Sequence, residues 1–388
     1  MKRIVICCDG TWNRLDAAYP TNVVRLAESV ASESPDGTKQ IVWYDEGVGS
    51  GNTAVARSID RWLGGGFGAG LMTKVEQAYR FLIFNYDPGD QIFIFGFSRG
   101  AFTARSLAGL IRNCGIVEQA LARRMHEAIA LYRGREADSH PDSDKSCEFR
   151  YAACPSIHLD DRDIEWRMKN VPDYDVSAST LLQIRYLGVW DTVGALGLPN
   201  YFRIARFFNG RHRFHDAKLS RSVVAARHAL AIDEYRRAFE PSVWANLDTL
   251  NDAAAASGRA VPFEQIWFPG DHGSIGGGGD IEKLSSGGFL WIAEGAADMG
   301  LSFRKVALEQ ARARADHRGP LTNQSKKSGG IMRLLSRAAR QGPMLPTHIS
   351  ESAYKRWHEP ADALPEKKLY RPAALARIAE LLGGPEAP

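Results

Sequence analysis

Short apolar runs and longer amphipathic stretches alternate along most of this chain, with polar or glycine-rich residues between them. Apolar runs of strand length predict strands at 3–8, 40–44, 91–96, 183–190 and 264–268. Helical stretches separate several of these runs, near 21–32, 70–85, 101–112 and 119–132, and a last helix is predicted at 373–382. This alternation favours the α/β class, in which helices cover both faces of a mostly parallel central sheet.

Two segments interrupt the alternation and are interpreted as insertions that form a cap of helices and loops. The first, at about 133–180, is rich in Asp, Ser and Arg and has little periodicity, which predicts loops. The second, at about 199–222, begins with PNYFRIARFFNGRHRFHDA, where aromatic and basic residues are interleaved. We divide the chain into a main domain at 1–318 and a C-terminal extension at 319–388, a linker with short helices.

The strand predicted at 91–96 runs directly into Gly96-Phe97-Ser98-Arg99-Gly100, and a helical stretch follows. Strand, G-x-S-x-G and helix in this order are typical of a nucleophile elbow. Gly96 and Gly100 would let the two backbones approach closely, and Ser98 would lie near a helix N-terminus, which favours developing negative charge. The alternative interpretation is a glycine-rich turn without chemistry.

Polar residues follow several predicted strands, where ligand sites form at the carboxyl edge of a parallel sheet. They are Asp9, Asp45, Ser98, Asp191 and His272. A serine nucleophile needs a base and an acid that orients the base, in the chain order Ser, acid, His.

Asp191 and His272 fit this order as the acid and the base for Ser98. A capping aspartate and a loop histidine bonded to backbone remain the alternatives for these two residues. Asp233 and Asp271 are rival acids, although Asp271 adjoins the histidine and would rarely point at its ring.

An oxyanion hole needs two N–H donors aimed at the developing charge. The backbone of Arg99, which follows the nucleophile, is the first candidate. The loop after the first strand offers the second, through Gly10 or Thr11. We expect Asp9 to hold this loop by accepting backbone hydrogen bonds.

Several other functions find little support. A strand ending in Asp-Gly-Thr resembles a haloacid-dehalogenase phosphatase, but that chemistry needs an aspartate where this chain has Cys7. The glycine runs at 64–70 and 276–279 lack the Gly-Lys-Ser/Thr ending of a phosphate loop. His212 and His215 have no acidic partner motif, so we expect no metal and no cofactor.

Composition and cysteine usage indicate the kind of partner and the compartment that we expect for this protein. A net charge of +4, from 49 basic and 45 acidic residues, is too balanced to suggest nucleic acid. Five cysteines, two of them adjacent, without a C-x-x-C pair, indicate reduced thiols and folding in a cytoplasm. No apolar run approaches the roughly 18 residues of a membrane span. MKRIVICCDG is interpreted as the first strand and not as a signal peptide.

The motifs resemble those of an uncharacterised α/β-hydrolase family that includes the catalytic domain of type VI secretion lipase effectors of the first class. The segments that carry the resemblance are CCDGTWN (7–13), YDEGVGSG (44–51), FGFSRGAFTARSLAGLI (95–111), LGVWDTVGALG (187–197), RHALAIDEYRRAFEP (227–241) and WFPGDHGSIGGG (267–278). The resemblance implies an α/β-hydrolase fold with a triad of Ser98, Asp191 and His272.

It also implies esterase or phospholipase activity, export by a type VI-like machine, and a secretion-machinery or immunity-protein partner. The chain departs from the family at Ser274, where many relatives have an aspartate. It is also too short for the large membrane-docking module of the big effectors.

We therefore expect a serine hydrolase that cleaves lipid or phospholipid acyl esters. The alternatives are a small-ester or carbohydrate esterase, and a non-catalytic scaffold that keeps the fold. In the 199–217 segment, Phe202, Phe207 and Phe208 would contact acyl chains; an amphipathic core helix is equally compatible with this pattern. A basic helix near 331–340 could lie on an anionic membrane, although the pattern favours a solvated helix or linker.

Overall fold

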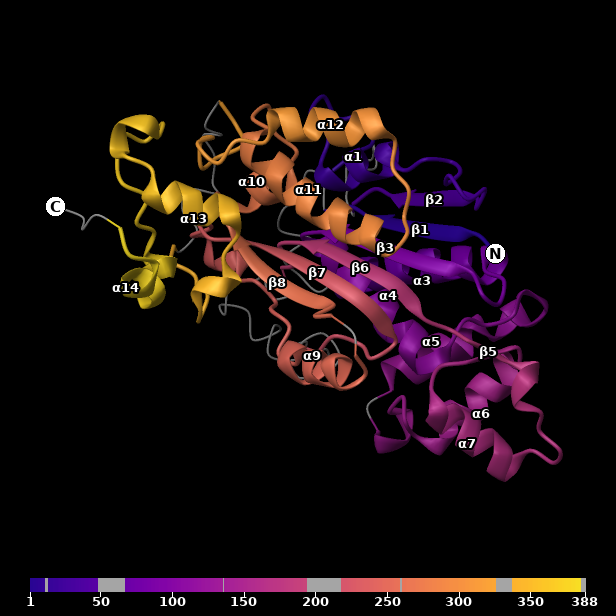
Figure 1. Ribbon diagram of the computed structural model, residues 1–388. Helices are drawn as coiled ribbons and strands as arrows, with labels where there is room; N and C mark the ends of the chain where they lie inside the picture. The colour runs from indigo at the N-terminus through magenta and orange to yellow at the C-terminus, as the bar shows by residue number, and fades with distance from the viewer. Residues whose placement is uncertain are drawn as a thin grey trace.

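The computed structural model describes residues 1–10, 13–47, 67–134, 136–193, 218–258, 260–325 and 337–384. In these ranges, six strands form a central sheet in the order β2-β1-β3-β6-β7-β8, and every pairing is parallel (Figure 1). They are β1 (Arg3–Cys8), β2 (Gln40–Asp45), β3 (Gln91–Phe97), β6 (Ile184–Trp190), β7 (Val223–Ala231) and β8 (Phe263–Phe268). The α/β class with a mostly parallel sheet is therefore confirmed.

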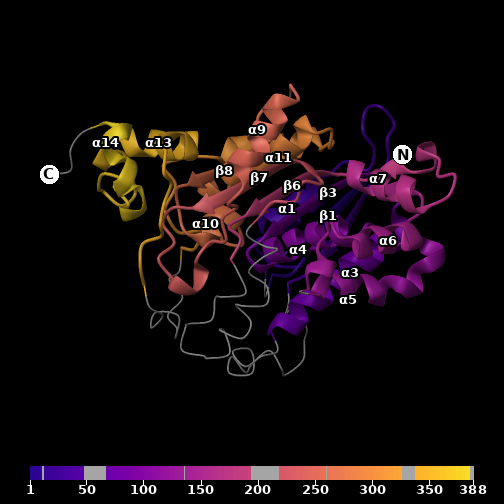
Figure 2. The ribbon, with the colours of Figure 1, turned by 90° about the horizontal axis from the view of Figure 1, so that it is seen from below.

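One face of the sheet is covered by α1 (Asn22–Ser29) and α11 (Lys283–Asp298), with α12 (Lys305–Arg314) packed on α11. The other face is covered by α3 (Phe67–Asn85), α4 (Arg99–Cys114), α5 (Met125–Arg133) and α9 (Leu247–Ala256), as Figures 1 and 2 show. Strands that are buried on both faces have apolar residues along their whole length, and this pattern predicted β1 and β3 from the sequence. Adjacent Cys7 and Cys8 belong to different core clusters, and all five cysteines are buried and form no disulfide.

Two predictions about secondary structure are wrong. The sequence did not indicate β7, because Arg227 and His228 interrupt its apolar run. Arg227 pairs with Glu264 on β8 at 2.8 Å, and Nδ1 of the buried His228 lies 3.1 Å from Gln265 Oε1 on the same strand. Neighbouring side chains therefore satisfy both polar groups inside a central strand.

The first insertion is not a set of loops. It contains α6 (Asp144–Ala153) and α7 (Asp161–Asn170), with the two-residue strands β4 (Ile157–His158) and β5 (Thr180–Leu181). Ser143 and Asp160 cap the two helices by accepting backbone N–H groups at 3.2 Å. A buried ion pair between Arg150 and Asp163 joins them. Local capping and one tertiary pair thus order a segment without strong periodicity.

The C-terminal extension packs on the β8 edge of the sheet and shares a hydrophobic core with it (Figure 1). Leu230 and Trp267 of the sheet contact a cluster that includes Trp357 and Leu375. The extension contains α13 (Glu351–His358) and α14 (Ala379–Leu382), the latter preceded by a 3₁₀ helix at Ala373–Ile378. The N-terminus and α14 lie toward opposite ends of the molecule in both ribbon views (Figures 1 and 2).

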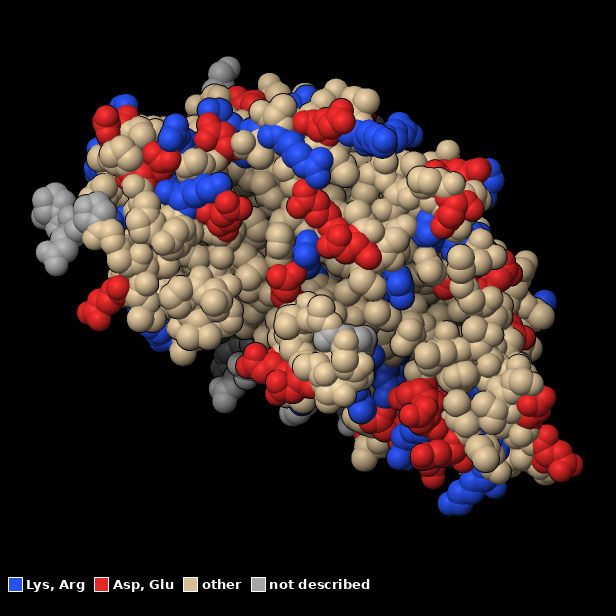
Figure 3. Space-filling model, viewed as in Figure 1, with Lys and Arg blue, Asp and Glu red and all other residues tan. Residues whose placement is uncertain are grey.

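The surface seen in Figure 3 carries lysines and arginines intermixed with aspartates and glutamates, so neither sign dominates that face. Within the described residues, no helix combines the length and the apolar character that crossing a membrane requires. The 199–217 segment, with Phe202, Phe207 and Phe208, lies outside the described residues.

Candidate active site

Ser98 occupies a strained turn between β3 and α4. Its φ of +58° and ψ of −120° lie in a region that side chains other than glycine rarely adopt, and such strain gathers at functional sites. A Cβ added at Gly96 would lie 2.5 Å from the Gly100 carbonyl oxygen, and one at Gly100 would lie 2.1 Å from the Cys8 carbonyl oxygen. Glycine is therefore required at both positions for strand and helix to approach so closely.

His272 is the first residue of the short helix α10 (His272–Gly276), which follows β8 in the chain. Its Nε2 lies 2.8 Å from Ser98 Oγ. The imidazole is flanked by the rings of Phe97 and Phe239, with centroids 4.6 Å and 4.8 Å away. The side chain of Asp271 caps α10 by accepting the Ser274 N–H at 2.9 Å. Packing on both sides and a capped helix hold the ring in place.

Asp191 follows β6 directly and completes a continuous hydrogen-bonded chain. Its Oδ2 lies 2.5 Å from His272 Nδ1, and its Oδ1 accepts the Ala231 N–H at 3.0 Å. Because Nδ1 faces a carboxylate, we assign the imidazole proton to Nδ1, which leaves Nε2 to accept from Ser98. The residue is fully buried, with φ at +39°.

Burial by itself would raise the pKa of Asp191. The positive charge of Arg340 and the hydrogen bonds from His272 and Arg340 outweigh this effect and hold the pKa well below its usual range. The carboxylate is therefore ionised at every pH at which the protein would work.

Arg340 is the site residue that sequence reasoning missed. Its Nη1 lies 2.6 Å from Asp191 Oδ1, and its Nη2 lies 2.9 Å from Asp191 Oδ2. It comes from the segment interpreted as a basic helix at 331–340, of which 331–336 lie outside the described residues and 337–340 are not helical. The membrane-facing interpretation is wrong for Arg340, because its side chain is only 4% exposed. Nothing in a basic, glycine-flanked segment signals a burial partner 149 residues away.

Asp9 holds the loop after β1, although mostly through side chains. Its carboxylate accepts from the Gly10 N–H at 2.7 Å, Asn13 Nδ2 at 3.0 Å, Thr21 Oγ1 at 2.6 Å and Tyr44 OH at 2.9 Å. The Gly10 amide thus donates to Asp9 in this structure, and its assignment to the oxyanion hole stays a prediction. A Cβ at Gly10 would lie 3.2 Å from Ser98 Cβ, so this glycine makes room beside the nucleophile. Thr11 lies outside the described residues.

The two rival acids, and Asp45 at the end of β2, have different partners. Asp233 accepts from the Gly270 N–H at 2.8 Å and Tyr370 OH at 2.7 Å. Asp271 accepts from both the N–H and the Oγ of Ser274 at 2.9 Å. Asp45 pairs with Lys74 Nζ at 2.6 Å. In the described structure, none of these three carboxylates is a hydrogen-bond partner of the His272 ring. Asp191 occupies that position.

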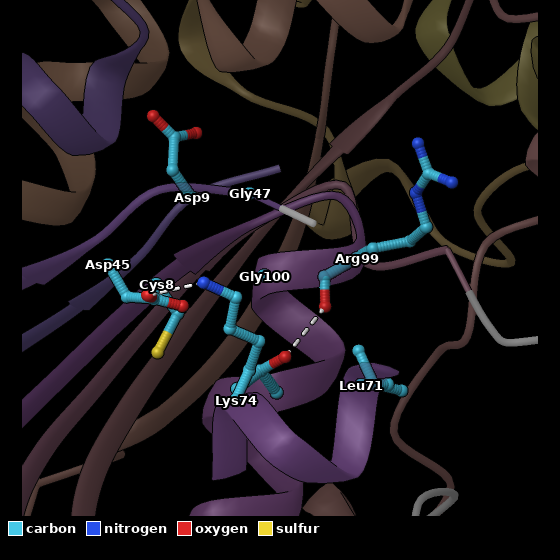
Figure 4. A pocket seen from close by; sticks show the side chains of 9 residues that line it. Cys8, Asp9, Asp45, Gly47, Leu71, Lys74, Arg99 and Gly100 are labelled. Carbon is cyan, nitrogen blue, oxygen red and sulfur yellow. Dashed lines mark hydrogen bonds and ion pairs between the residues drawn. The ribbon is translucent and has the colours of Figure 1, made fainter. Parts of the chain in front are cut away.

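A small pocket adjoins the nucleophile turn at the ends of β1 and β2 (Figure 4). Asp45 and Lys74 form one wall, and the first turn of α4 forms another, with Arg99 extending away from that ion pair. Burial lowers the pKa of Arg99 to about 10. Among the described residues, no three His, Cys, Asp or Glu side chains are grouped to hold a metal ion.

A Ser-His-Asp chain at the carboxyl edge of a parallel sheet is the arrangement on which serine hydrolases rely. The sequence model described as "T6SS, Phospholipase effector Tle1-like, catalytic domain" matches residues 2–295. The chain therefore belongs to the family of Tle1-like catalytic domains of type VI secretion phospholipase effectors.

Three individual proteins are also similar. The uncharacterized protein YEL023C of Saccharomyces cerevisiae is 30% identical over 248 residues, which are 62% of this chain and 32% of that protein. An uncharacterized protein from Pseudomonas aeruginosa has a TM-score of 0.42 and 15% identity, over 82% of this chain and 49% of the other. The Tle1 effector bound to the VgrG spike has a TM-score of 0.36 and 19% identity, over 73% and 52%.

These two TM-scores are too low to carry an argument. The chain spans about a third to a half of the length of these relatives.

Proposed function

We propose that this protein is a serine hydrolase with an α/β-hydrolase fold that cleaves carboxylic esters through an acyl-enzyme. The observation that carries the proposal is the unbroken hydrogen-bonded chain from Ser98 through His272 to Asp191. The strained φ of the serine supports it, because such a backbone conformation costs free energy and is typical of functional sites.

The proposed reaction begins when Ser98 Oγ attacks the ester carbonyl carbon while His272 Nε2 takes the hydroxyl proton. The Arg99 N–H, at the positive end of α4, would stabilise the negative oxygen of the tetrahedral intermediate. His272 then gives its proton to the leaving alcohol, and the acyl group remains on Ser98. A water molecule, deprotonated by His272, attacks the acyl-enzyme; the bond to Ser98 Oγ then breaks, His272 returns the proton to Oγ, and the acid leaves. Asp191 stays ionised and orients the ring throughout.

We propose lipid acyl esters, most specifically phospholipids, as the substrate. Membership in a family of phospholipase effector domains supports this choice. A small-ester or carbohydrate esterase would use the same triad, so acyl chain length is the property that separates the two.

We further propose a partner from the secretion machinery and export by a type VI machine. The support is membership in the family of type VI secretion effector domains. A membrane contact and an immunity-protein partner belong to the same proposal.

The proposal is tested by labelling the folded protein with a fluorophosphonate probe, which reacts with activated serines. Wild type should be labelled and Ser98→Ala should not. Ser257→Ala should be labelled like wild type, because the Ser257 hydroxyl donates to the carbonyls of Ala253 and Ala254 at the end of α9. Folded wild type that resists labelling would favour the scaffold. A nitrophenyl ester series then decides the substrate, since preference for acetyl over long acyl chains contradicts the lipase assignment.

A further inference from the structure

Arg340 lies outside residues 2–295, the part of the chain that the family model matches. It nevertheless contacts both oxygens of the carboxylate that orients His272. The guanidinium binds Asp191 through two nitrogens, and bidentate pairing fixes the plane of a carboxylate as well as its charge.

The same guanidinium also ties together the backbone around the site. Nη1 donates to the Ala231 carbonyl at 2.9 Å, at the end of β7, and Nη2 donates to the Phe239 carbonyl at 2.5 Å. Ala231 is the residue whose N–H binds Asp191, and the ring of Phe239 packs on His272. One buried side chain thus contacts three groups that set the position of the acid and the base.

The segment that carries Arg340 is held in place from both sides. Before it, the Ala338 N–H donates to the Tyr235 carbonyl at 2.8 Å, and Arg337 forms a β-bridge with Arg236. After it, the chain packs into the core that the extension shares with β7 and β8. The position of the guanidinium is therefore set by folded structure on each side.

We propose that Arg340 is a positioning residue for ester hydrolysis, and that the C-terminal extension is consequently part of the active site. Arg340 does not touch the reacting atoms. It holds the Asp191 carboxylate in the plane of the imidazole and offsets its buried charge. This inference rests on the proposed function, since it assigns Arg340 to the same Ser98–His272–Asp191 site.

The charge and the geometry of Arg340 predict separate effects. A misplaced orienting group costs on the order of 10- to 100-fold in kcat, so Arg340→Gln should lower kcat by that factor with little change in KM. A positive charge near the imidazole disfavours its protonated form, so its loss should move the acidic limb of the kcat/KM profile up by about one pH unit. Arg340→Lys should keep the limb near its wild-type position but still lower kcat, because an ammonium cannot bind both oxygens in a fixed plane.

The other charged groups around His272 stay the same in these variants. Its backbone N–H faces Glu234 Oε2 at 3.3 Å, and Glu234 is paired with Arg236 at 2.5 Å. Asp271 precedes it in the chain, and His228 lies behind Asp191, with a pKa that burial lowers to about 3. A shift of the acidic limb in Arg340→Gln alone is therefore attributable to the guanidinium.

The matched control is Arg356, a second buried arginine in the extension. It donates to Glu366 at 2.6 Å and to the carbonyls of His317 and Gly319 at 2.6 Å and 2.7 Å. Within the described residues, none of these partners belongs to the triad. Arg356→Lys should lower the melting temperature while kcat and the acidic limb stay at their wild-type values. Rates are divided by the concentration of sites titrated with the fluorophosphonate probe, so that misfolded protein does not count.

The inference is overturned if folded Arg340→Gln or Arg340→Lys keeps kcat within twofold of wild type with the same acidic limb. Should Arg340→Gln fail to fold, Arg340→Lys decides alone, through its kcat. Failure of the proposed function is a different result: wild type itself would then not react with the probe at Ser98.

Discussion

Two fully buried aspartates in this protein are each bound by a buried arginine, and they do different things. Asp163 in the insertion pairs with Arg150, whose Nε lies 2.8 Å and 2.9 Å from its two oxygens. Asp191 at the sheet edge pairs with Arg340. Each arginine also donates to two backbone carbonyls, from Asn113 and Pro141 in one case, and from strand and turn residues in the other.

The difference lies in what else the carboxylate binds. The Asp163 carboxylate also accepts the Leu159 N–H at 3.0 Å and a hydrogen bond from the Cys147 thiol, so its described partners all belong to the fold of the insertion. Asp191 has His272 Nδ1 in addition to a backbone N–H, and that ring leads on to Ser98. The same kind of ion pair therefore joins two helices in one place and, in the proposed mechanism, orients the base His272 in the other. A buried salt bridge does not by itself reveal a functional site; the partner beyond it does.

The largest expected difference between Asp191 and Asp163 is in their effect on activity. Asp191→Asn should lower kcat/KM by about 10⁴-fold, since an amide favours the wrong imidazole tautomer and meets donors from both Arg340 and His272. Asp163→Asn should leave the rate per titrated site within twofold of wild type. Hydrolysis of a nitrophenyl ester measures both. Equal losses in the two variants would mean that Asp191, too, acts only through folding.

The next effect is on stability, and it should be similar for the two pairs. Removing one partner of a buried pair costs about 3–5 kcal/mol, because the other charge is left uncompensated, whereas replacing both by apolar residues is often neutral. Asp163→Leu should therefore be strongly destabilising, and Arg150→Met/Asp163→Leu should regain most of the free energy of unfolding in urea.

The matched double variant, Arg340→Met/Asp191→Leu, should regain stability in the same way yet stay inactive. A double variant that remained as unstable as its single variant would contradict the equivalence of the two pairs. Activity in the Arg340→Met/Asp191→Leu protein would contradict the role of Asp191.

The smallest effect concerns Asp233, a buried carboxylate that binds a hydroxyl and an N–H instead of a guanidinium. Burial raises its pKa to about 6, against the ordinary 3.8. Its contribution to stability is therefore present below pH 4 and lost as the pH rises through 6, by about 3 kcal/mol at most. Asp191 behaves in the opposite sense: its lowered pKa favours the folded state at neutral pH, and this is lost only in acid.

Asp233→Asn cannot ionise, so it should be more stable than wild type at pH 8 and similar to it at pH 4, as urea unfolding at the two pH values would show. Its kcat should be close to that of wild type. A loss of kcat comparable to that of Asp191→Asn would instead make Asp233 the orienting acid.

Much of the sheet and of the Ser98–His272–Asp191 site could be predicted from the sequence. Five apolar runs predicted five strands, because a strand covered on both faces has to be apolar along its length. Ser98, Asp191 and His272 were placed together because parallel strands end at one edge, and each residue follows such a strand. Gly96 and Gly100 predicted a close approach of the backbones around Ser98, which only glycine permits.

Only the tertiary structure decided which polar groups inside the molecule satisfy one another. The strand β7, the helices of the insertion and Arg340 all depend on charged or polar residues whose partners are distant in the chain, as Arg227 is to Glu264 and Arg340 is to Asp191. Periodicity records whether a position is apolar, and so it locates the core. It cannot record that a buried arginine has found a carboxylate, because that depends on distances which exist only once the chain has folded.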